Sequence, residues 1–461
     1  MSKNIVKSMR PSSSPMSFKK STTKDKKRQS IHFIGVGGIG VSALAKYFLA
    51  RGVSVSGSDI KETEIVNELV KLGVRIKIGP HKAQNIPFGT ARVIYTAAVR
   101  KENPEYREAK QRRLPTQSYA EAIGELTKKY ETITISGAHG KSTTTALCAL
   151  VLEEGYCDPT VIIGTKVKEF GDSNFRGGYG PYLVLEADEW NKSFLNYSPK
   201  IAIITNIDAE HLDTYKNLDD VKKTFLQYLK KIPSDGMVVA NWDDRNVKDV
   251  VWQSKKRVIW YSQKDRDAEE IKKHLKIPGE HNLSNALAAA RLGSLLGIPY
   301  VHILQALSGF RGVWRRFEFK GMDKNGAYVI SDYGHHPKEI MATIAGARER
   351  YPMRRVWGVY QPHQYQRLQY LWNDFTTAFD MADRVLLLPV YDVAGRETKL
   401  ARDAVNSKKL AKELVERGKL ATYHPSFGAT KRVIADESKK GDIILVMGAG
   451  DIYTIADDLV R

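Results

Sequence analysis

A chain of 461 residues is long enough for two or three domains, each with its own hydrophobic core. Its 42% hydrophobic and 27% charged residues are typical of a globular protein, and the absence of any run of about 18 apolar residues argues against a transmembrane helix. The net charge is +20, and nine Lys or Arg and one Asp in residues 1–30 supply +8 of it. This head, rich in Ser, Thr and Lys, predicts a disordered basic tail and not a secretory signal, and a transit peptide is the alternative. Cys148 and Cys157 lack metal-ligand spacing and fit a reducing compartment, so we expect the cytoplasm.

Residues 31–59 predict a strand, a glycine loop, a helix and a second strand. Gly35, Gly37 and Gly40 form G-x-G-x-x-G, and Asp59 follows Gly40 by 19 positions. This spacing indicates a mononucleotide-binding βαβ unit. The ligand could be a dinucleotide or any other diphosphate at the helix N-terminus, and a turn that only packs helix on strand is the alternative without a ligand.

The next stretch continues the alternation of strands and helices. Residues 74–79 and 92–99 predict strands, and residues 103–113 and 119–130 predict helices. We place the first domain boundary near residue 129.

Residues 131–150 predict a strand, a short glycine loop and a helix. The loop reads Gly-Ala-His-Gly-Lys-Ser, a shortened phosphate loop, because Ile135 stands where the longer pattern has its first glycine. Lys141 is the candidate for contact with the outer phosphates, and the Ser142 hydroxyl is a candidate Mg²⁺ ligand. A glycine turn with a surface lysine is the alternative.

Two acidic clusters follow apolar strands in the middle of the chain. The first strand (181–189) ends in Glu186, Asp188 and Glu189. The second lies within residues 199–215, with Asn206, Asp208, His211 and Asp213 at and beyond its end. Ligands gather at the carboxyl ends of parallel strands, and Mg²⁺ prefers oxygen ligands, so we expect a magnesium site opposite the phosphates. Solvated acids are the alternative.

Two pairs of polar residues flank the end of this middle segment. Asn282 and Asn285, at i and i+3, share a helix face and can read an adenine edge, although Asn282 could instead cap its helix. Arg315 and Arg316 can clamp phosphate or be solvated. We place the second boundary near residue 313.

The remainder again alternates strands and helices. We expect strands within residues 327–337, 356–367, 383–397 and 443–451. His335 and His336 follow the first of these, and no third ligand at a useful spacing supports zinc.

In these blocks the chain resembles the Mur ligases. The matching stretches, in family order over residues 31–461, are GVGGIGVSALA, SGAHGKSTTT, LEADEWNKSFL, TNIDAEHLDTY, GEHNLSNALAA, GVWRRFEFKG, SDYGHHPKEI, QPHQYQR and VMGAGDI. The resemblance implies three α/β domains: a Rossmann-like UDP-substrate domain (31–129), a P-loop-type ATP and magnesium domain (130–313), and a Rossmann-like C-terminal ligase domain (314–461). It also implies an ATP-dependent ligase of peptidoglycan synthesis, a monomer or homodimer with no specific nucleic-acid partner, that joins L-alanine to UDP-N-acetylmuramate through an acyl phosphate.

The resemblance also implies roles for individual residues. The ATP-binding set is Gly137, Ala138, His139, Gly140, Lys141, Ser142, Thr143, Asn282, Asn285, Arg315 and Asp332. The UDP-substrate set is Gly35, Gly37, Gly38, Gly40, Ser58, Asp59 and His81. Ser142, Glu186 and His211 would hold Mg²⁺, with two ions expected. His335, Gln364 and Arg367 would lie near the substrate carboxylates. The catalytic set is Lys141, His211, Arg316 and His336.

Three departures from the family pattern bear on function. Gln364 stands where the family usually has arginine, Trp190, Asn191 and Lys192 replace Ser, Asp and a small residue, and the segment between residues 263 and 279 is short, where relatives have extra strands. Three other functions remain open. The first is a ligase that attaches recycled tripeptide to UDP-N-acetylmuramate. The others are a nicotinamide-dependent dehydrogenase and a non-catalytic nucleotide-binding scaffold.

Overall fold

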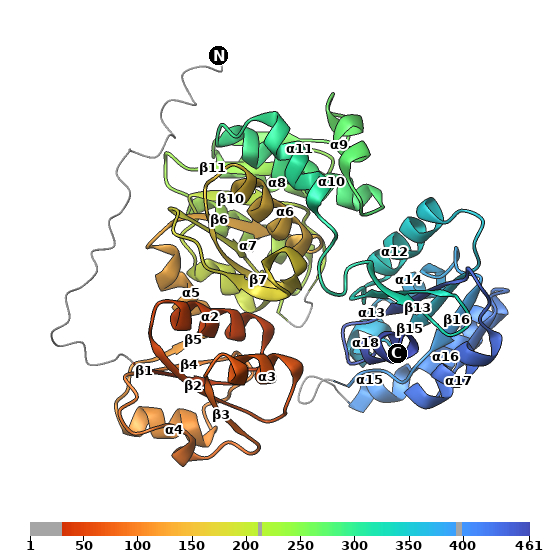
Figure 1. Ribbon diagram of the computed structural model, residues 1–461, viewed down its shortest axis with the longest axis horizontal. Helices are drawn as coiled ribbons and strands as arrows, with labels where there is room; N and C mark the ends of the chain where they lie inside the picture. The colour runs from red at the N-terminus through yellow and green to blue at the C-terminus, as the bar shows by residue number, and fades with distance from the viewer. Residues whose placement is uncertain (1–29, 211–213, 393–398) are drawn as a thin grey trace. The chain divides into compact units, whose positions relative to one another are not determined.

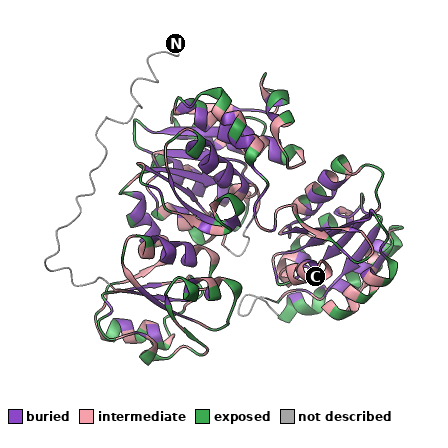
Figure 2. Cartoon of the chain, in the orientation of Figure 1, coloured by how far each residue is buried: buried purple, intermediate pink, exposed green. Residues whose placement is uncertain are grey.

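The computed structural model describes residues 30–210, 214–392 and 399–461, and these residues form three β-sheets flanked by helices (Figure 1). The predicted basic tail, apart from Ser30, lies outside the described residues. Buried residues follow the strands of each sheet and the helix faces turned toward them (Figure 2). Among the described residues, no helix is both long and apolar enough to cross a membrane.

The N-terminal sheet has five parallel strands in the order β3-β2-β1-β4-β5. The strands are β1 (Ser30–Ile34), β2 (Ser54–Asp59), β3 (Arg75–Ile78), β4 (Arg92–Tyr95) and β5 (Thr116–Ser118). The helices are α2 (Ile39–Ala50), α3 (Glu64–Lys71), η1 (Ala83–Asn85), α4 (Pro104–Gln111) and α5 (Tyr119–Thr127). The strand order reverses at β1, and ligands of open α/β sheets bind at such a point. The loop after β1 therefore occupies the expected ligand-binding edge.

The central sheet has the order β12-β11-β10-β6-β9-β7-β8, and only β8 runs antiparallel to its neighbour. Its strands are β6 (Glu131–Ser136), β7 (Thr160–Val167), β8 (Ser173–Arg176), β9 (Tyr182–Glu186), β10 (Ile201–Ile204), β11 (Met237–Asn241) and β12 (Val258–Tyr261). Its helices are α6 (Lys141–Glu154), η2 (Lys168–Phe170), η3 (Trp190–Asn196), α7 (Leu218–Lys230), α8 (Arg245–Ser254), α9 (Ala268–His274), α10 (Glu280–Leu295) and α11 (Tyr300–Gly309). Because β6 lies between β9 and β10, the loop after β6 meets the carboxyl ends of both neighbours.

The C-terminal sheet has the order β13-β14-β18-β15-β16-β17, with β13 as an antiparallel edge strand. Its strands are β13 (Glu318–Met322), β14 (Tyr328–Asp332), β15 (Val356–Tyr360), β16 (Arg384–Leu387), β17 (Ala421–Tyr423) and β18 (Ile443–Met447). Its helices are α12 (Pro337–Arg350), α13 (Tyr365–Tyr370), α14 (Trp372–Thr377), α15 (Lys399–Ala404), α16 (Ser407–Glu416), α17 (Phe427–Glu437) and α18 (Tyr453–Leu459).

The chain forms two compact units. One holds the N-terminal and central sheets, and the other comprises Lys276–Asn282 and Arg311–Arg461. In the first unit, the buried Asn174 of β8 donates to the Ile39 carbonyl at 2.6 Å and accepts from Lys46 Nζ at 2.8 Å. The central sheet thus contacts the first turn of α2, the helix that follows the N-terminal glycine loop.

Several predicted strands are shorter than the sequence suggested. The strand predicted over 356–367 ends at Tyr360, and helix α13 begins at Tyr365. The strands predicted over 92–99, 383–397 and 443–451 end at Tyr95, Leu387 and Met447. In each case the chain continues as loop once the neighbouring strand no longer pairs with it. The short segment between residues 263 and 279 contains helix α9.

Candidate functional site

The central glycine loop connects β6 to α6. Gly137 has φ +147°, and a Cβ there would lie 2.1 Å from Thr205 Oγ1. Gly140 has φ +82°, and a Cβ there would lie 2.5 Å from Asn285 Oδ1. Both positions therefore require glycine, because an added methyl group would be strained and would collide with a polar side chain. The sequence pattern predicted this turn, and the close approach of Thr205 and Asn285 explains why it is tight.

Lys141 is the first residue of α6 and lies back over the loop. Its Nζ donates to the Gly137 carbonyl at 2.7 Å and to Glu189 Oε2 at 3.0 Å, and Asp188 Oδ1 is 3.8 Å away. Burial alone would lower the pKa of Lys141, but the carboxylates of Glu189 and Asp188 outweigh it and raise the pKa above its usual value. Lys141 is a cation at every physiological pH, and it is held at the N-terminus of a helix.

The loop is also fixed from the end of β10. Asn206 Oδ1 accepts from the His139 N–H at 2.8 Å, and Asn206 Nδ2 and Thr205 Oγ1 donate to the His139 carbonyl at 2.9 and 2.8 Å. On the other side, the Tyr215 hydroxyl donates to the Glu189 carbonyl at 2.5 Å. Side chains from the segment between β10 and α7 thus hold both the loop and Glu189, the ion-pair partner of Lys141.

Glu186 ends β9 beside this loop. Its Oε1 accepts from the Gly164 N–H at 2.7 Å, and the Ser142 hydroxyl is a second hydrogen-bond partner. Burial raises the pKa of Glu186, and the bonds from Gly164 and Ser142 only partly offset this. An under-compensated carboxylate beside a hydroxyl is an oxygen donor set that fits Mg²⁺. His211, the third expected ligand, lies outside the described residues.

Helix α10 carries the two asparagines. Asn285 Oδ1 accepts from Thr144 Oγ1 at 3.1 Å and lies against Gly140, so this amide contacts the central loop directly. Asn282 Nδ2 donates to the Pro278 carbonyl at 2.6 Å. The alternative that Asn282 caps its helix is wrong, because α10 begins two residues earlier, at Glu280.

The N-terminal glycine loop joins β1 to α2. The N–H groups of Gly35 and Val36 donate to the Ser58 carbonyl at 2.9 and 3.1 Å, and the Gly37 N–H donates to Asp59 Oδ2 at 2.8 Å. A Cβ at Gly40 would lie 2.9 Å from the Tyr119 hydroxyl. Gly38 is the N-cap of α2 and supplies no capping side chain, so the first amides of this helix are available to an anion.

Ser58 and His81 meet at a carboxylate that the sequence did not single out. Ser58 Oγ donates to Glu105 Oε2 at 2.7 Å, and His81 Nδ1 contacts Glu105 Oε1 at 2.8 Å. His32 Nε2 and Asn85 Nδ2 contact the same carboxylate at 3.0 and 2.8 Å. No local signal points to Glu105, because its partners are scattered over residues 32–85.

In the C-terminal unit, Asp332 and Arg315 bond to the backbone, whereas Arg316 pairs with a side chain. Asp332 accepts from the N–H groups of Phe317 and Gly334, each at 2.7 Å, and burial raises the pKa of its carboxyl above the usual range. Arg315 is buried and donates to the carbonyls of Gly448 and Gly450. Arg316 pairs with Glu339 at 3.4 Å.

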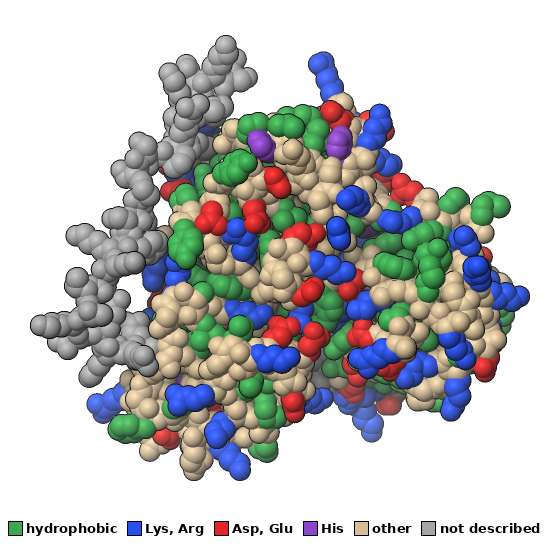
Figure 3. All heavy atoms as spheres, viewed as in Figure 1, with side chains coloured by type: hydrophobic (Ala, Val, Ile, Leu, Met, Phe, Trp, Pro, Cys, Tyr) green, Lys and Arg blue, Asp and Glu red, His purple; other side chains and the backbone are tan. Residues whose placement is uncertain are grey.

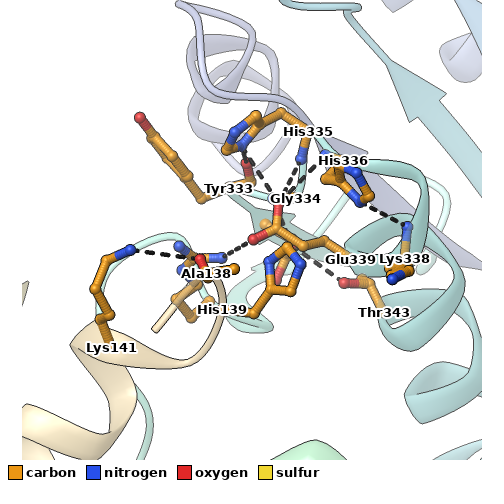
Figure 4. Close-up of polar contacts among 12 residues, drawn as sticks. Ala138, His139, Lys141, Tyr333, Gly334, His335, His336, Lys338, Glu339 and Thr343 are labelled. Atoms are coloured by element: carbon orange, nitrogen blue, oxygen red, sulfur yellow. Dashed lines mark hydrogen bonds and ion pairs between the residues drawn. The ribbon is translucent and has the colours of Figure 1, made fainter. Parts of the chain in front are cut away.

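His335 and His336 begin helix α12. His336 is the N-cap, and its Nδ1 accepts from the Lys338 N–H at 3.2 Å, while Glu339 accepts from the N–H groups of both histidines (Figure 4). Burial and the nearby charge of Arg367 lower the pKa of His335 well below its usual range. His335 is therefore neutral at physiological pH.

Gln364 and Arg367 lie beside a pair of stacked rings. Gln364 has φ +72°, and its N–H donates to the Tyr391 carbonyl at 3.1 Å. His363 stacks on Tyr391 at 5.5 Å, and Arg367 Nη1 lies 3.4 Å from His363 Nδ1. The His335 and His363 rings are 5.9 Å apart. The structure thus brings together all three residues predicted to contact the amino acid, and it adds His363 and Tyr391.

The structure therefore assembles a lysine-bearing phosphate loop beside carboxylates, a second glycine loop without a lysine, and a neutral histidine beside an arginine. These features define a nucleotide-binding α/β protein equipped for phosphoryl transfer. Three family models match the chain: "Mur ligase family, catalytic domain" over residues 30–131, "Mur ligase middle domain" over 135–274, and "Mur ligase, glutamate ligase domain" over 315–450. The chain belongs to the Mur ligase family.

Individual relatives agree with this assignment. The chain is 39% identical over 458 residues to a UDP-N-acetylmuramate–L-alanine ligase of Desulfatibacillum aliphaticivorans, with 94% of this chain and 99% of that protein covered. The crystal structure of UDP-N-acetylmuramate–alanine ligase from Thermotoga maritima superimposes with a TM-score of 0.79 at 31% identity, covering 94% of this chain and 98% of that one. A murein peptide ligase from Psychrobacter arcticus, at 22% identity, shares the fold with a TM-score of 0.69 and the same coverage.

Proposed function

We propose that this protein joins L-alanine to UDP-N-acetylmuramate with the hydrolysis of ATP to ADP and phosphate, as a step in peptidoglycan precursor synthesis. The observation that carries the proposal is the position of Lys141, an ion-paired cation at the N-terminus of α6 and beside the carboxyl ends of β9 and β10. The identity to L-alanine ligases over nearly the whole chain supports the choice of substrates.

The proposed reaction has two steps. An oxygen of the muramyl carboxylate attacks the γ-phosphorus of ATP, the bond from that phosphorus to the β,γ-bridging oxygen breaks, and ADP leaves. The alanine amine then attacks the acyl carbon, phosphate departs with the C–O bond electrons, and the amine loses a proton as the amide forms. Because carboxylate and ATP are both anions, charge repulsion opposes the first step, and preorganised cations lower that barrier.

Residues of the central loop would neutralise the triphosphate. The amides of Gly137–Thr143 and the Lys141 ammonium would bind the β- and γ-phosphates, and Asn282 and Asn285 would contact adenine. Arg315, Arg316 and Asp332 are proposed nucleotide contacts from the C-terminal unit. Ser142, Glu186 and His211 would hold Mg²⁺, with two ions expected, and the metal would add positive charge at the transferring phosphoryl group.

The remaining site residues would bind the two substrates, UDP-N-acetylmuramate and L-alanine. We assign the UDP diphosphate to the first turn of α2, with Gly35, Gly37, Gly38, Gly40, Ser58, Asp59 and His81 around it. His335, His336, Gln364 and Arg367 would position the alanine and muramyl carboxylates. We propose these domain roles within the expected boundaries, 31–129, 130–313 and 314–461, and we propose a cytoplasmic enzyme that acts as a monomer or homodimer.

The test is ADP release by the purified full chain. We expect ADP only when UDP-N-acetylmuramate, L-alanine and MgATP are all present. Turnover without the UDP-sugar, or none with all three, would refute the assignment. NAD binding with no effect of ATP would favour the dehydrogenase alternative, and nucleotide binding without turnover would favour the scaffold.

A second candidate substrate follows from Gln364. An amide replaces the family's arginine beside Arg367 and His363, so one positive charge for the incoming carboxylate is missing. A ligase for recycled tripeptide is the corresponding alternative. Comparing L-alanine, glycine, L-serine and the tripeptide as acceptors distinguishes them, and we expect the highest kcat/KM with L-alanine.

No specific nucleic-acid partner is proposed. On the face drawn in Figure 3, Lys and Arg side chains lie among Asp and Glu side chains and do not gather into one basic stripe. The net charge of +20 suits a protein with polyanionic small ligands.

A further inference from the structure

A buried carboxylate organises the polar side chains behind the N-terminal glycine loop. Glu105 lies in the first turn of α4 and is 0% exposed. Its Oε2 contacts His32 Nε2 and Ser58 Oγ at 3.0 and 2.7 Å, and its Oε1 contacts His81 Nδ1 and Asn85 Nδ2, each at 2.8 Å. Four groups therefore surround the two oxygens, two on each.

All four of these groups must donate. Burial on its own would raise the pKa of Glu105, but the hydrogen bonds from His32, Asn85, Ser58 and His81 outweigh it and lower the pKa to about 2. An ionised carboxylate only accepts hydrogen bonds, so each partner atom carries a hydrogen that points at Glu105.

In their neutral forms, the two histidines that meet this requirement are opposite tautomers. His32 presents Nε2–H to Glu105, and its Nδ1 lies 3.0 Å from the Ser56 hydroxyl, which can donate to it. His81 presents Nδ1–H to Glu105, so in the neutral ring its Nε2 is a hydrogen-bond acceptor. Histidine in water prefers the Nε2–H form, so the tautomer of His81 is imposed by the protein.

His81 also lies beside the loop. Its Nδ1 is 3.4 Å from Ser58 Oγ, and the Ser58 carbonyl accepts from the N–H groups of Gly35 and Val36. The His81 side chain is 14% exposed, and its Nε2 has no hydrogen-bond partner among the described residues. An acceptor at this place repels phosphate oxygens and attracts an N–H or O–H group.

We propose that Glu105 is a positioning residue of the UDP-substrate site, which locks His81 as the Nδ1–H tautomer so that Nε2 accepts from a donor of the nucleoside, either the uracil imide N–H or a ribose hydroxyl. The proposal deepens the function assigned above and rests on the UDP-substrate role of the N-terminal loop. Glu105 itself touches no substrate in this account. The diphosphate is bound by the amides of α2, and His81 reads the nucleoside.

The first experiment observes the tautomers directly. The full chain, labelled with ¹⁵N-histidine, is studied by long-range ¹H–¹⁵N correlation at about pH 8.5, with His32→Gln and His81→Gln variants for assignment. We expect His81 as Nδ1–H and His32 as Nε2–H, and UDP should shift the His81 Nε2 resonance but not that of His32. His81 as Nε2–H, or unmoved by saturating UDP, would overturn the proposal. This readout does not need turnover, so it separates failure of the inference from failure of the proposed reaction.

The second experiment tests whether Glu105 acts through His81. Glu105→Gln places an amide among four donors and removes the demand for the Nδ1–H form, so the KM for UDP-N-acetylmuramate should rise about tenfold, as expected for one lost hydrogen bond. The kcat and the KM for ATP should change less than about twofold. The exposed Glu102→Gln is the matched control and should match the wild type.

A double variant makes the test specific. In a His81→Ala background, Glu105→Gln should cause no further rise in this KM, because the side chain it positions is gone. An equal rise in both backgrounds, or no rise in either, would overturn the proposal. N3-methyl-UDP and 2′-deoxy-UDP then identify the donor. The analogue that lacks the group bound by His81 should bind wild type and His81→Ala with equal affinity, whereas the other analogue should bind wild type more tightly.

Discussion

Two glycine loops in the same compact unit share a strand–loop–helix arrangement and differ in charge. Each follows a central strand of a parallel sheet and opens a helix. In each, a side-chain oxygen from the neighbouring strand end accepts from a loop N–H: Asp59 for Gly37, and Asn206 for His139. At the N-terminal loop this acceptor is an anion and residues 35–40 contain no cation, whereas at the central loop it is a neutral amide and Lys141 is present.

The acids behind the two loops also differ in how far hydrogen bonds offset the effect of burial on their pKa values. Glu105 has four donors, which lower its pKa to about 2 against the opposing effect of burial, whereas burial raises the pKa of Glu186. Glu105 is already satisfied by its own protein and serves a fixed scaffold. At Glu186 the hydrogen bonds from Gly164 and Ser142 do not outweigh burial, which is consistent with its proposed role as a Mg²⁺ ligand. If the proposed roles hold, one backbone arrangement binds a diphosphate at the first loop and serves phosphoryl transfer at the second.

The largest expected effect comes from removing the cation that distinguishes the central loop. Lys141→Ala should lower kcat for ADP release by about 10²–10⁴, because one preorganised charge at the transferring phosphoryl group is lost. Binding of UDP at the other loop should not change. The exposed Lys129→Ala is the matched control. Near-normal turnover of Lys141→Ala would show that the central loop does not depend on the charge of Lys141.

The two acids should respond oppositely to pH and to substitution. The folded-state pKa of Glu105 lies below the unfolded value of 4.5, so its contribution, roughly 3 kcal/mol of unfolding free energy, is complete above about pH 5 and is lost as the pH falls toward 2. Glu105→Gln should therefore lower stability at pH 7 and flatten the acid limb in urea titrations, with Glu102→Gln as control.

Glu186 has a raised pKa, so its ionised form opposes folding above that pKa. Glu186→Gln should leave stability at pH 7 unchanged or higher while reducing activity and the increase in Tm on adding MgATP. If Glu186→Gln destabilises the protein as much as Glu105→Gln does, the two carboxylates play the same structural role.

A smaller effect should follow from filling the central turn. Gly137→Ala introduces a Cβ 2.1 Å from Thr205 Oγ1 at φ +147°, which should cost about 1–3 kcal/mol and weaken ATP binding. Gly52→Ala is the control, because Gly52 also has positive φ (+76°) but nothing lies within 4 Å of its Cβ. Thermal unfolding and the KM for ATP measure both variants. If both variants lose the same thermal stability, backbone strain alone, and not the contact with Thr205, makes the central turn require glycine.

The smallest effect is expected from making the N-terminal loop resemble the central one. Asp59→Asn keeps an acceptor for the Gly37 N–H and removes only the charge, so the KM for UDP-N-acetylmuramate should change less than about threefold. Asp59→Ala removes the acceptor and should raise this KM about tenfold, as for one hydrogen bond. If the two variants give the same KM, the hydrogen bond to Gly37 has no part in shaping the loop.

The sequence predicted those parts of the site that a local pattern encodes. The spacing of Gly35, Gly37 and Gly40 predicted the first loop, the run from Gly137 to Ser142 predicted the second, and both open helices as expected. Strand ends were predicted less well, because the end of β15 at Tyr360 depends on where β16 and β18 stop pairing.

Long-range partners could not be predicted from local spacing. Glu105 looked like an ordinary acid in the first turn of a helix, and its four partners come from two strands, the loop after β3 and a short 3-10 helix. Similarly, the sequence named three acids after β9, but only the packed sheet shows that Glu189 and not Glu186 pairs closely with Lys141. The individual site roles stay predictions.

The central claim is that a cation at residue 141 allows a UDP-linked acid to be phosphorylated by ATP. The most direct measurement compares wild type with Lys141→Ala in the presence of UDP-N-acetylmuramate and L-alanine. It follows transfer of the labelled phosphoryl group from [γ-³²P]ATP and the accompanying release of ADP. The account predicts ADP release that requires both substrates and falls at least about 100-fold in the variant. ADP release independent of UDP-N-acetylmuramate, or equal in the two proteins, would contradict it.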